Sequence, residues 1–395
     1  MKRIYLDHIA AAPLAPGVFE KMRPFLETDF GNPQSLHSDG QAAAEALAAA
    51  REHVSALIGA DPGEVIFTAS GTEANNLAIK GLAQAQRAKG NHILVSAIEH
   101  ASVLNAVKTL EKSGFQTTIV PVDGEGRIDP ADVVVALRKE TVLVSVMTAN
   151  SEVGTIEPVE DIVREVKAKA PGVLVHTDAV AAAGNVPLDV RALGVDALSF
   201  SGNAFYGPKG SAALFLKKGT KLVPQIEGGI QEGGRRGGTE DVAAIVGMGE
   251  AARLAAKAMP DRLVRMTALR DRLIEGLPRA VERVRLTGSP GRRLPYHASF
   301  CVEFVGGEAM LLSLDFKGIA ASSFSACTSK SLKVSHVLLA MGLDHTLAQG
   351  SLIFSLIDST AAADIDFLLD AFPPVVERLR KMSPLYTDFL KEQGR

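Results

Sequence analysis

The chain has 395 residues, of which 47% are hydrophobic and 22% charged, with a formal net charge of −3. This ordinary globular composition excludes a disordered or collagen-like chain, and the lack of basic surplus argues against nucleic acid or a membrane surface as a partner. The two cysteines, Cys301 and Cys327, are too few for a disulfide framework and fit a reducing compartment. No run of ~18 apolar residues predicts a membrane span, and the N-terminus does not read as a signal peptide. We therefore expect a soluble cytoplasmic protein.

From residue 40 to about residue 260, short apolar runs alternate with amphipathic stretches. The predicted strands are Val65–Ser70, His92–Ala97, Thr117–Val122, Thr141–Met147, Val173–Asp178, Ala197–Ser201 and Ser211–Leu216. The predicted helices between them include Glu73–Gln86, Ala101–Ser113 and Val159–Ala168. Strands that are apolar on both faces predict an α/β fold with a mostly parallel, helix-covered sheet. The last two strands are too close together for a helical crossover, so one of them should pair antiparallel.

The pattern changes after residue 256, where a smaller α+β unit is expected to begin. Its predicted elements are helices at Asp261–Glu275 and Glu308–Asp315, a strand at Ala298–Phe304 and a helix at Asp364–Met382. The Pro373-Pro374 pair should break or kink that last helix, and the tail from residue 383 is mostly polar. Asp241–Ala256 is also helix-like, and the pattern changes after it. The predicted division is therefore a large domain at 16–256 and a small domain comprising 1–15 and 257–395.

Eight sequence motifs follow one another along nearly the whole chain. They are YLD (5–7), GNPQSLHSDG (31–40), IFTASGTEANNLAIKG (66–81), IEHASV (98–103), HTDAV (176–180), YGPKG (206–210), GGIQEGGRRGGTE (228–240) and SACTSK (325–330). Together they resemble the cysteine desulfurases of the NifS/IscS group, pyridoxal-phosphate enzymes of the class V aminotransferase family. The resemblance implies the type I pyridoxal-phosphate transferase fold, a seven-strand sheet, a homodimer and a place in iron–sulfur cluster assembly or sulfur transfer.

The residues themselves predict part of a cofactor site. Ser70-Gly71-Thr72 stands where a strand ends and a helix begins, so free backbone N–H groups there could cradle a phosphate; an ordinary turn with Thr72 as N-cap is the alternative. The resemblance implies that Asp178 pairs with the pyridinium nitrogen, that His100 stacks on the ring, and that Thr239 reaches the phosphate of the neighbouring subunit. Gly71 and Ser201 also keep family positions. A strand-end Asp that caps a helix and a structural His remain the alternatives.

Several positions depart from the family pattern, and most of them would touch cofactor or substrate. The lysine that holds the cofactor covalently in the family is replaced by Ala204, and the histidine before it by Asn203. Without that amine the chain loses both the covalent attachment and the base at the substrate α-carbon, a loss expected to cost several powers of ten in rate. Ile353 replaces the arginine that pairs with the substrate carboxylate, and Ala181 replaces a glutamine. These losses predict a pseudoenzyme.

Cys327 matches the family's nucleophilic cysteine, and Lys330 nearby would favour its thiolate. An inert buried cysteine is the alternative reading, and the strand-like surroundings of Cys301 predict that Cys301 belongs to the core. No CxxC or His-rich spacing predicts a metal site, and Cys327 is the one residue considered as a possible cluster ligand.

Three functions remain open from the sequence. The first is a non-catalytic dimer that docks an iron–sulfur scaffold protein and offers Cys327 as a persulfide acceptor or cluster ligand. The second is an enzyme that holds pyridoxal phosphate non-covalently through Thr72, His100, Asp178 and Thr239, as a desulfurase or an altered transferase or lyase. The third is a binder of another small molecule in a vacated pocket occupied by His8, Asn203 and Ile353.

Overall fold

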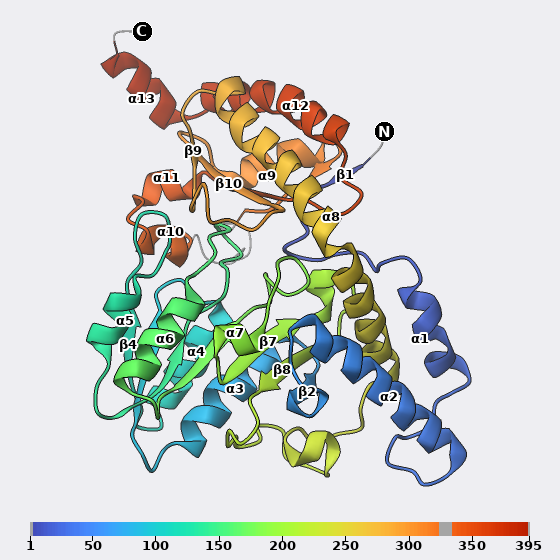
Figure 1. Cartoon of the computed structure of the whole chain (residues 1–395). Helices are drawn as coiled ribbons and strands as arrows, with labels where there is room; N and C mark the ends of the chain where they lie inside the picture. The colour runs from blue at the N-terminus through green and yellow to red at the C-terminus, as the bar shows by residue number, and fades with distance from the viewer. Residues whose placement is uncertain (1–2, 324–333, 394–395) are drawn as a thin grey trace.

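A seven-stranded sheet forms the centre of the larger unit of the protein (Figure 1). We analysed a computed structural model, which describes residues 3–323 and 334–393. The strand order is β2-β8-β7-β6-β5-β3-β4. The bounds are β2 Val65–Thr68, β3 His92–Ser96, β4 Gln116–Val120, β5 Thr141–Ser145, β6 Leu174–Asp178, β7 Ala197–Ser201 and β8 Ala212–Leu216. All seven strands coincide with predicted ones to within two residues, and β8 runs antiparallel to both β2 and β7, as expected.

Helices pack on both faces of this sheet, which explains why its inner strands carry no polar face. Every residue of β3, β5 and β8 is buried. The edge strand β4 is instead partly exposed and rich in Gln and Thr, as edge strands that must resist further pairing commonly are. The covering helices are α3 Gly71–Ala85, α4 Ala101–Glu111, α5 Pro130–Ala136, α6 Val159–Lys169 and α7 Val190–Leu193.

A single long helix, α8 (Val242–Ala280), joins the large unit to the smaller one (Figure 1). It packs against α1 (Val18–Glu27) and α2 (Ser38–Leu57). The sequence analysis predicted two separate helices here, and that prediction is wrong. The helix continues through Pro260 and Pro278 because a buried stripe runs along its whole length and outweighs two lost backbone hydrogen bonds. The predicted domain boundary at residue 257 falls within this helix.

The smaller unit is built on a three-stranded antiparallel sheet of order β12-β10-β9. Its strands are β9 Val284–Leu286, β10 His297–Val302 and β12 Ser351–Ser355, and its helices are α9 Gly307–Asp315, α10 His336–Ala340, α11 His345–Gln349, α12 Ala362–Lys381 and α13 Pro384–Glu392. The N-terminal strand β1 (Ile4–Tyr5) pairs with β11 (Ile319–Ala320) of this unit.

Two features of the C-terminal region differ from the sequence prediction. Helix α12 runs unbroken through Pro373-Pro374, because Phe372 and Val376 are buried on either side of the pair and hold the helix in place. The tail forms helix α13, whose Tyr386 and Phe389 rings pack 5.5 and 5.0 Å from Phe304. Aromatic contacts to a distant residue, rather than a periodic pattern, determine this helix.

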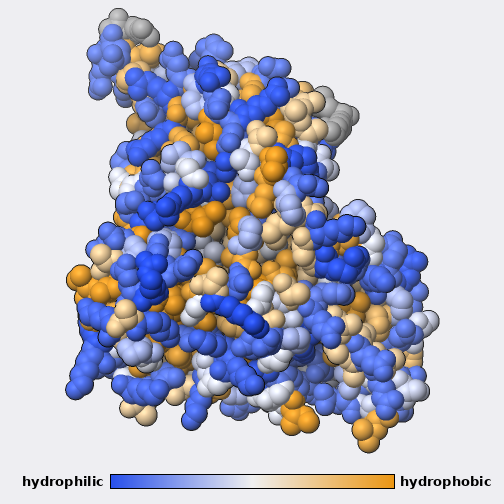
Figure 2. Space-filling model, viewed as in Figure 1, coloured by the Kyte–Doolittle hydropathy of each residue, from blue (hydrophilic) through white to orange (hydrophobic). Residues whose placement is uncertain are grey.

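The face of the protein seen in Figure 2 is predominantly hydrophilic, with hydrophobic residues interspersed and more of them where the two units meet. Within residues 3–323 and 334–393, no helix combines the length and the apolar character needed to cross a membrane.

Candidate functional site

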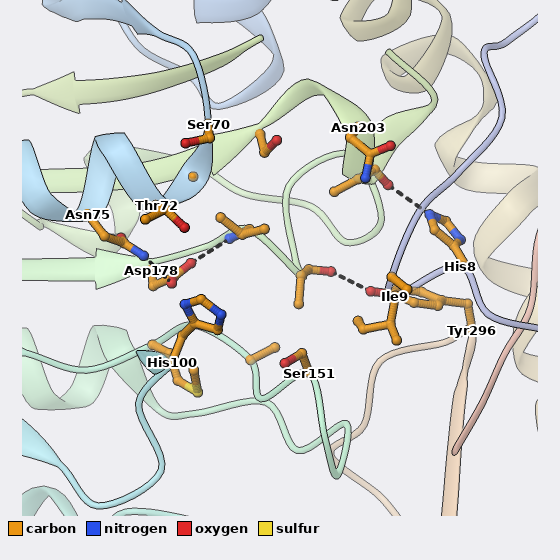
Figure 3. Close-up of a pocket in the computed structure, with 18 residues that line it drawn as sticks. His8, Ile9, Ser70, Thr72, Asn75, His100, Ser151, Asp178, Asn203 and Tyr296 are labelled. Atoms are coloured by element: carbon orange, nitrogen blue, oxygen red, sulfur yellow. Dashed lines mark hydrogen bonds between the residues drawn. The ribbon is translucent and has the colours of Figure 1, made fainter. Parts of the chain in front are cut away.

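A cavity of about 390 Å³ lies where the large sheet meets the N-terminal segment and the smaller unit (Figure 3). Asp178 and Ser201, the last residues of the parallel neighbours β6 and β7, both line it. The carboxyl ends of parallel strands are where open α/β sheets bind ligands. His8 and Tyr296 line the cavity from the side of the smaller unit. The strand order therefore determines the position of the cavity, and residues distant in sequence complete it.

The N-terminus of α3 points its first residues at this cavity. Ser70 caps the helix by accepting a hydrogen bond from the Glu73 backbone N–H (3.1 Å), so the alternative in which Thr72 is the N-cap is wrong. Gly71 and Thr72 line the cavity. A Cβ atom at Gly71 would lie 2.6 Å from Val180 Cγ2, so only glycine allows this close approach. Unpaired N–H groups at a helix start and a nearby hydroxyl form a suitable cradle for an anion such as phosphate.

Asp178 is 5% exposed and is held by two hydrogen bonds. Its Oδ1 accepts from the Val180 backbone N–H (2.9 Å), and its Oδ2 accepts from Asn75 Nδ2 (2.6 Å; Figure 3). Burial raises the pKa of this carboxyl, while the two hydrogen bonds and the nearby His100 lower it. Asp178 is thus both a turn-stabilising residue and a buried acidic group presented to the cavity.

His100 begins helix α4 and lies across the cavity from Ser70 and Thr72 (Figure 3). Its Nδ1 accepts a hydrogen bond from the Ser102 backbone N–H (3.1 Å) and lies 2.7 Å from Ser102 Oγ. Asn75 also lines the cavity and was missed in the sequence analysis. Its position four residues after Gly71 on one helix face was the signal that could have found it.

Ala204 lies in a 3₁₀ turn, Gly202–Phe205, and lines the cavity. Its carbonyl oxygen accepts from Asn185 Nδ2 (3.0 Å) and lies 2.9 Å from His8 Nε2. His8 is buried between the rings of Tyr206 and Tyr296, whose centroids are 5.0 and 4.8 Å away. Burial lowers the pKa of His8. Among the described residues that line the cavity there is no lysine and no arginine.

The neighbouring substituted positions also lie at this wall. Ala181 and Asn203 both line the cavity, where the Ala181 carbonyl accepts from Tyr296 Oη (2.8 Å). Asn203 Oδ1 accepts a hydrogen bond from the Ala12 backbone N–H (3.4 Å). The substituted wall is therefore closed by backbone carbonyls and aromatic rings rather than by an amine.

Two predicted residues, Ile353 and Thr239, are not in the described lining of this cavity. Ile353 was expected to occupy the cavity, and that prediction is wrong: it is buried in β12, paired with Ser299, and does not line the cavity. Thr239 is exposed and lies outside the cavity lining. Cys327 lies outside the described residues.

The other cysteine, Cys301, is buried in β10, which confirms its expected place in the core. Burial raises the pKa of the Cys301 thiol to about 12, so it is unreactive. In the parts of the chain that the structure describes, no three His, Cys, Asp or Glu side chains cluster as a metal site.

The sheet order and the position of the cavity define a type I transferase fold of the pyridoxal-phosphate class. The profile of the class-V aminotransferases matches residues 4–368, and the chain belongs to this family. It is 47% identical over 385 residues to a cysteine desulfurase IscS of Dictyoglomus turgidum, with 97% of each chain covered, and 45% identical over 394 residues to one from Clostridium botulinum, with 99% of each covered. A solved NifS-like protein superposes with a TM-score of 0.90 at 34% identity, covering 96% of this chain and all of that one. The resemblance seen in the sequence is confirmed.

Members of this family depend on pyridoxal phosphate, so we tested whether the cavity fits that group. The helix start with its obligatory Gly71, the buried Asp178 and the facing His100 fit a phosphate, a ring nitrogen and a ring face respectively. Ala204 does not fit a covalent attachment, which requires an amine. The residues present therefore fit the cofactor held without a covalent bond.

Proposed function

We propose that this protein is a desulfurase-type homodimer of cytoplasmic sulfur-transfer or iron–sulfur cluster metabolism that lacks the family's lysine-dependent desulfuration. In this proposal Cys327 accepts sulfur as a persulfide, or ligates a cluster, for an iron–sulfur scaffold partner. The single observation that carries the proposal is a cavity that keeps its acidic and helix-terminal walls but contains no amine or guanidinium among its described lining residues. We infer the metabolic context, sulfur transfer, from the cysteine desulfurases to which the chain is similar.

No histidine of the cavity replaces the missing lysine. Both ring nitrogens of His8 lie 2.9 Å from backbone carbonyl oxygens, those of Leu356 and Ala204, so neither is free to act on a substrate. His100 Nδ1 is occupied by Ser102. A cofactor bound here would supply its electron sink, but no residue of this wall offers the amine on which the family's proton transfer depends.

The sulfur step that we propose requires no redox partner. The Cys327 thiolate attacks the outer sulfur of a donor persulfide, R–S–SH. The donor S–S bond breaks, a new S–S bond forms at Cys327, and the donor leaves as the thiolate R–S⁻, while the transferred sulfur keeps its proton. The products are a Cys327 persulfide and a thiolate, so no oxidant or reductant is needed.

Intact-mass spectrometry after treatment with glutathione persulfide tests this step. We expect the protein to gain the mass of one sulfur atom, Cys327→Ser to gain none, and Cys301→Ser to behave like the unmodified protein because Cys301 is buried. Equal sulfur uptake by Cys327→Ser would refute the role of Cys327. Co-purification with an iron–sulfur scaffold protein, and its loss in Cys327→Ser, tests the partner.

The second candidate function is an enzyme that binds pyridoxal phosphate non-covalently. It is favoured by the glycine-dependent approach of α3 to Val180 and by the buried Asp178. Thr239 is exposed away from its own cavity, as a residue that serves a neighbouring subunit should be. Titration with pyridoxal phosphate should then give saturable binding that borohydride cannot trap, and pyridoxine phosphate, which lacks the aldehyde, should bind with similar affinity. Absence of saturation would end this candidate.

A further inference from the structure

A chain of hydrogen bonds links the two titratable groups that face each other in the cavity. Asn75 Nδ2 donates to Asp178 Oδ2 (2.6 Å) and to Ser102 Oγ (2.9 Å). Ser102 Oγ in turn lies 2.7 Å from His100 Nδ1. Asn75 is 1% exposed and Ser102 is 7% exposed, so solvent does not compete for these bonds. The chain therefore runs from Asp178 on β6 through α3 to the start of α4.

The hydrogen-bond donors in this network determine the amide orientation of Asn75 and the tautomer of His100. Both N–H bonds of the Asn75 amide are used, and its Oδ1 has no partner among the described residues. The opposite amide orientation would place Oδ1 2.6 Å from the Asp178 carboxylate, which repels it unless Asp178 is protonated. The Ser102 backbone N–H already donates to His100 Nδ1. His100 Nδ1 is thus an acceptor, and the neutral ring carries its proton on Nε2.

We propose that Asn75 is a positioning residue that holds Asp178 in its ionised state opposite a neutral His100 that offers Nε2–H to the cavity. This inference rests on the second candidate function, the non-covalent binding of a pyridoxal-type phosphate. Its consequence is selectivity: without a covalent bond, recognition of the ligand depends on a protonated ring nitrogen that pairs with Asp178.

Two titratable groups face Asp178. A protonated His100 would lower the pKa of Asp178, but the accepting Nδ1 excludes that form, and Glu99, in the turn before His100, interacts with Asp178 across the interior. Burial raises the pKa of Glu99 to about 8, so at neutral pH Glu99 is protonated and adds little charge. The hydrogen bond from Asn75 is among the interactions that lower the pKa of Asp178. Removing it should raise that pKa.

Equilibrium binding of pyridoxal phosphate and of its 1-deaza analogue, in which CH replaces the ring nitrogen, tests the inference with the full chain. A hydrogen bond to a charged group corresponds to a factor of roughly ten or more in affinity. We expect the unmodified protein to prefer the ring nitrogen by about that factor and Asn75→Leu, which keeps the size but cannot donate, to lose the preference at neutral pH. The neighbouring Asn76, whose amide donates to the Thr72 carbonyl, supplies the matched control Asn76→Leu, which should keep it.

The pH profile adds a readout that a merely structural role would not move. The preference requires an ionised Asp178 and a protonated ring nitrogen, so it is lost as the pH falls through the pKa of Asp178 and again at high pH, where the ring nitrogen loses its proton. In Asn75→Leu the lower midpoint should move to higher pH. In the unmodified protein, long-range proton–nitrogen spectra assigned with His100→Gln should place the His100 proton on Nε2.

Each contrary outcome is distinguishable from the others. If neither ligand binds the unmodified protein, the non-covalent candidate function and the inference are both overturned. If both bind and Asn75→Leu keeps the preference at neutral pH, or if the proton of His100 lies on Nδ1, the inference alone is overturned. The last measurement needs no folded Asn75 variant.

Discussion

Replacing Ala204 by lysine should restore covalent attachment of pyridoxal phosphate. The position lies in the 3₁₀ turn at the cavity wall, and its backbone is anchored by the bonds of Ala204 O to His8 and Asn185. The substitution therefore adds an amine without requiring the turn to move. The substitution adds four heavy atoms. If each takes the ~30 Å³ that a water molecule occupies in the liquid, the added side chain needs about 120 Å³. The cavity offers about 390 Å³.

The energetic cost of Ala204→Lys should be small enough to leave the fold intact. Ordering a lysine side chain costs up to about 2 kcal/mol of conformational entropy, and burial in an otherwise acidic cavity with Asp178 offsets part of the desolvation of the amine. We expect the unfolding free energy of Ala204→Lys to fall by no more than about that amount, measured by urea denaturation.

The assay is borohydride reduction followed by peptide mapping. Ala204→Lys loaded with pyridoxal phosphate should show the visible absorption of a Schiff base and a reduced cofactor adduct at position 204. Cysteine desulfuration should remain far below that of the family's active members, because no arginine is among the described lining residues to bind the substrate carboxylate. A folded Ala204→Lys that binds cofactor but forms no adduct would refute the reasoning, because residue 204 would then not face the cofactor.

Three further predictions concern the phosphate cradle, a buried acid and the core. Gly71→Ala should weaken pyridoxal phosphate binding about tenfold or more, because its Cβ would meet a valine methyl group at 2.6 Å, whereas Gly63→Ala, with open space around it, should not change the dissociation constant. Burial raises the pKa of Glu99 from 4.5 to about 8, so protonated Glu99 stabilises the fold at low pH and this stabilisation is lost as the pH rises through that range. The melting temperature of Glu99→Gln should therefore fall less between pH 5 and 8 than that of the unmodified protein. Melting temperatures that fall in parallel for the two proteins would contradict this. Phe372→Ala should cost about 3–5 kcal/mol in urea unfolding, while Phe316→Ala, at an 89% exposed position, should stay within about 0.5 kcal/mol; similar losses would show that Phe372 does not anchor the core.

The large sheet could be predicted from the sequence because each strand is a local apolar run between turn residues. The antiparallel β8 followed from the short connection after β7 alone. Helix α8 could not be predicted as one element, because local proline signals at Pro260 and Pro278 favour interruption. Burial against α1 and α2 and, in the smaller unit, against α12, β9 and β10 keeps it continuous. Tertiary packing overrode local propensity here.

The candidate site was predictable only in part for a similar reason. Asp178 and Gly71 stand at strand ends and helix starts, which are legible in sequence. His8 and Asn203 line the cavity, as expected from the family positions that they occupy. Tyr296 and Asn75 reach it from separate elements, and their proximity depends on how the smaller unit and α3 pack. The prediction that Ile353 would occupy the cavity is wrong because Ile353 is buried in β12, opposite Ser299, and lies outside the cavity lining. Strand register, which fixes the face of each side chain, cannot be read from a single strand.

The described lining of this cavity contains no amine, on which lysine-dependent desulfuration relies. The direct measurement is the alanine and sulfide that the purified protein releases from L-cysteine at saturating pyridoxal phosphate, with free pyridoxal phosphate as the blank. We predict release at the rate of the blank. Sustained cysteine-dependent release of both products well above the blank, abolished in Asp178→Asn, would contradict the account.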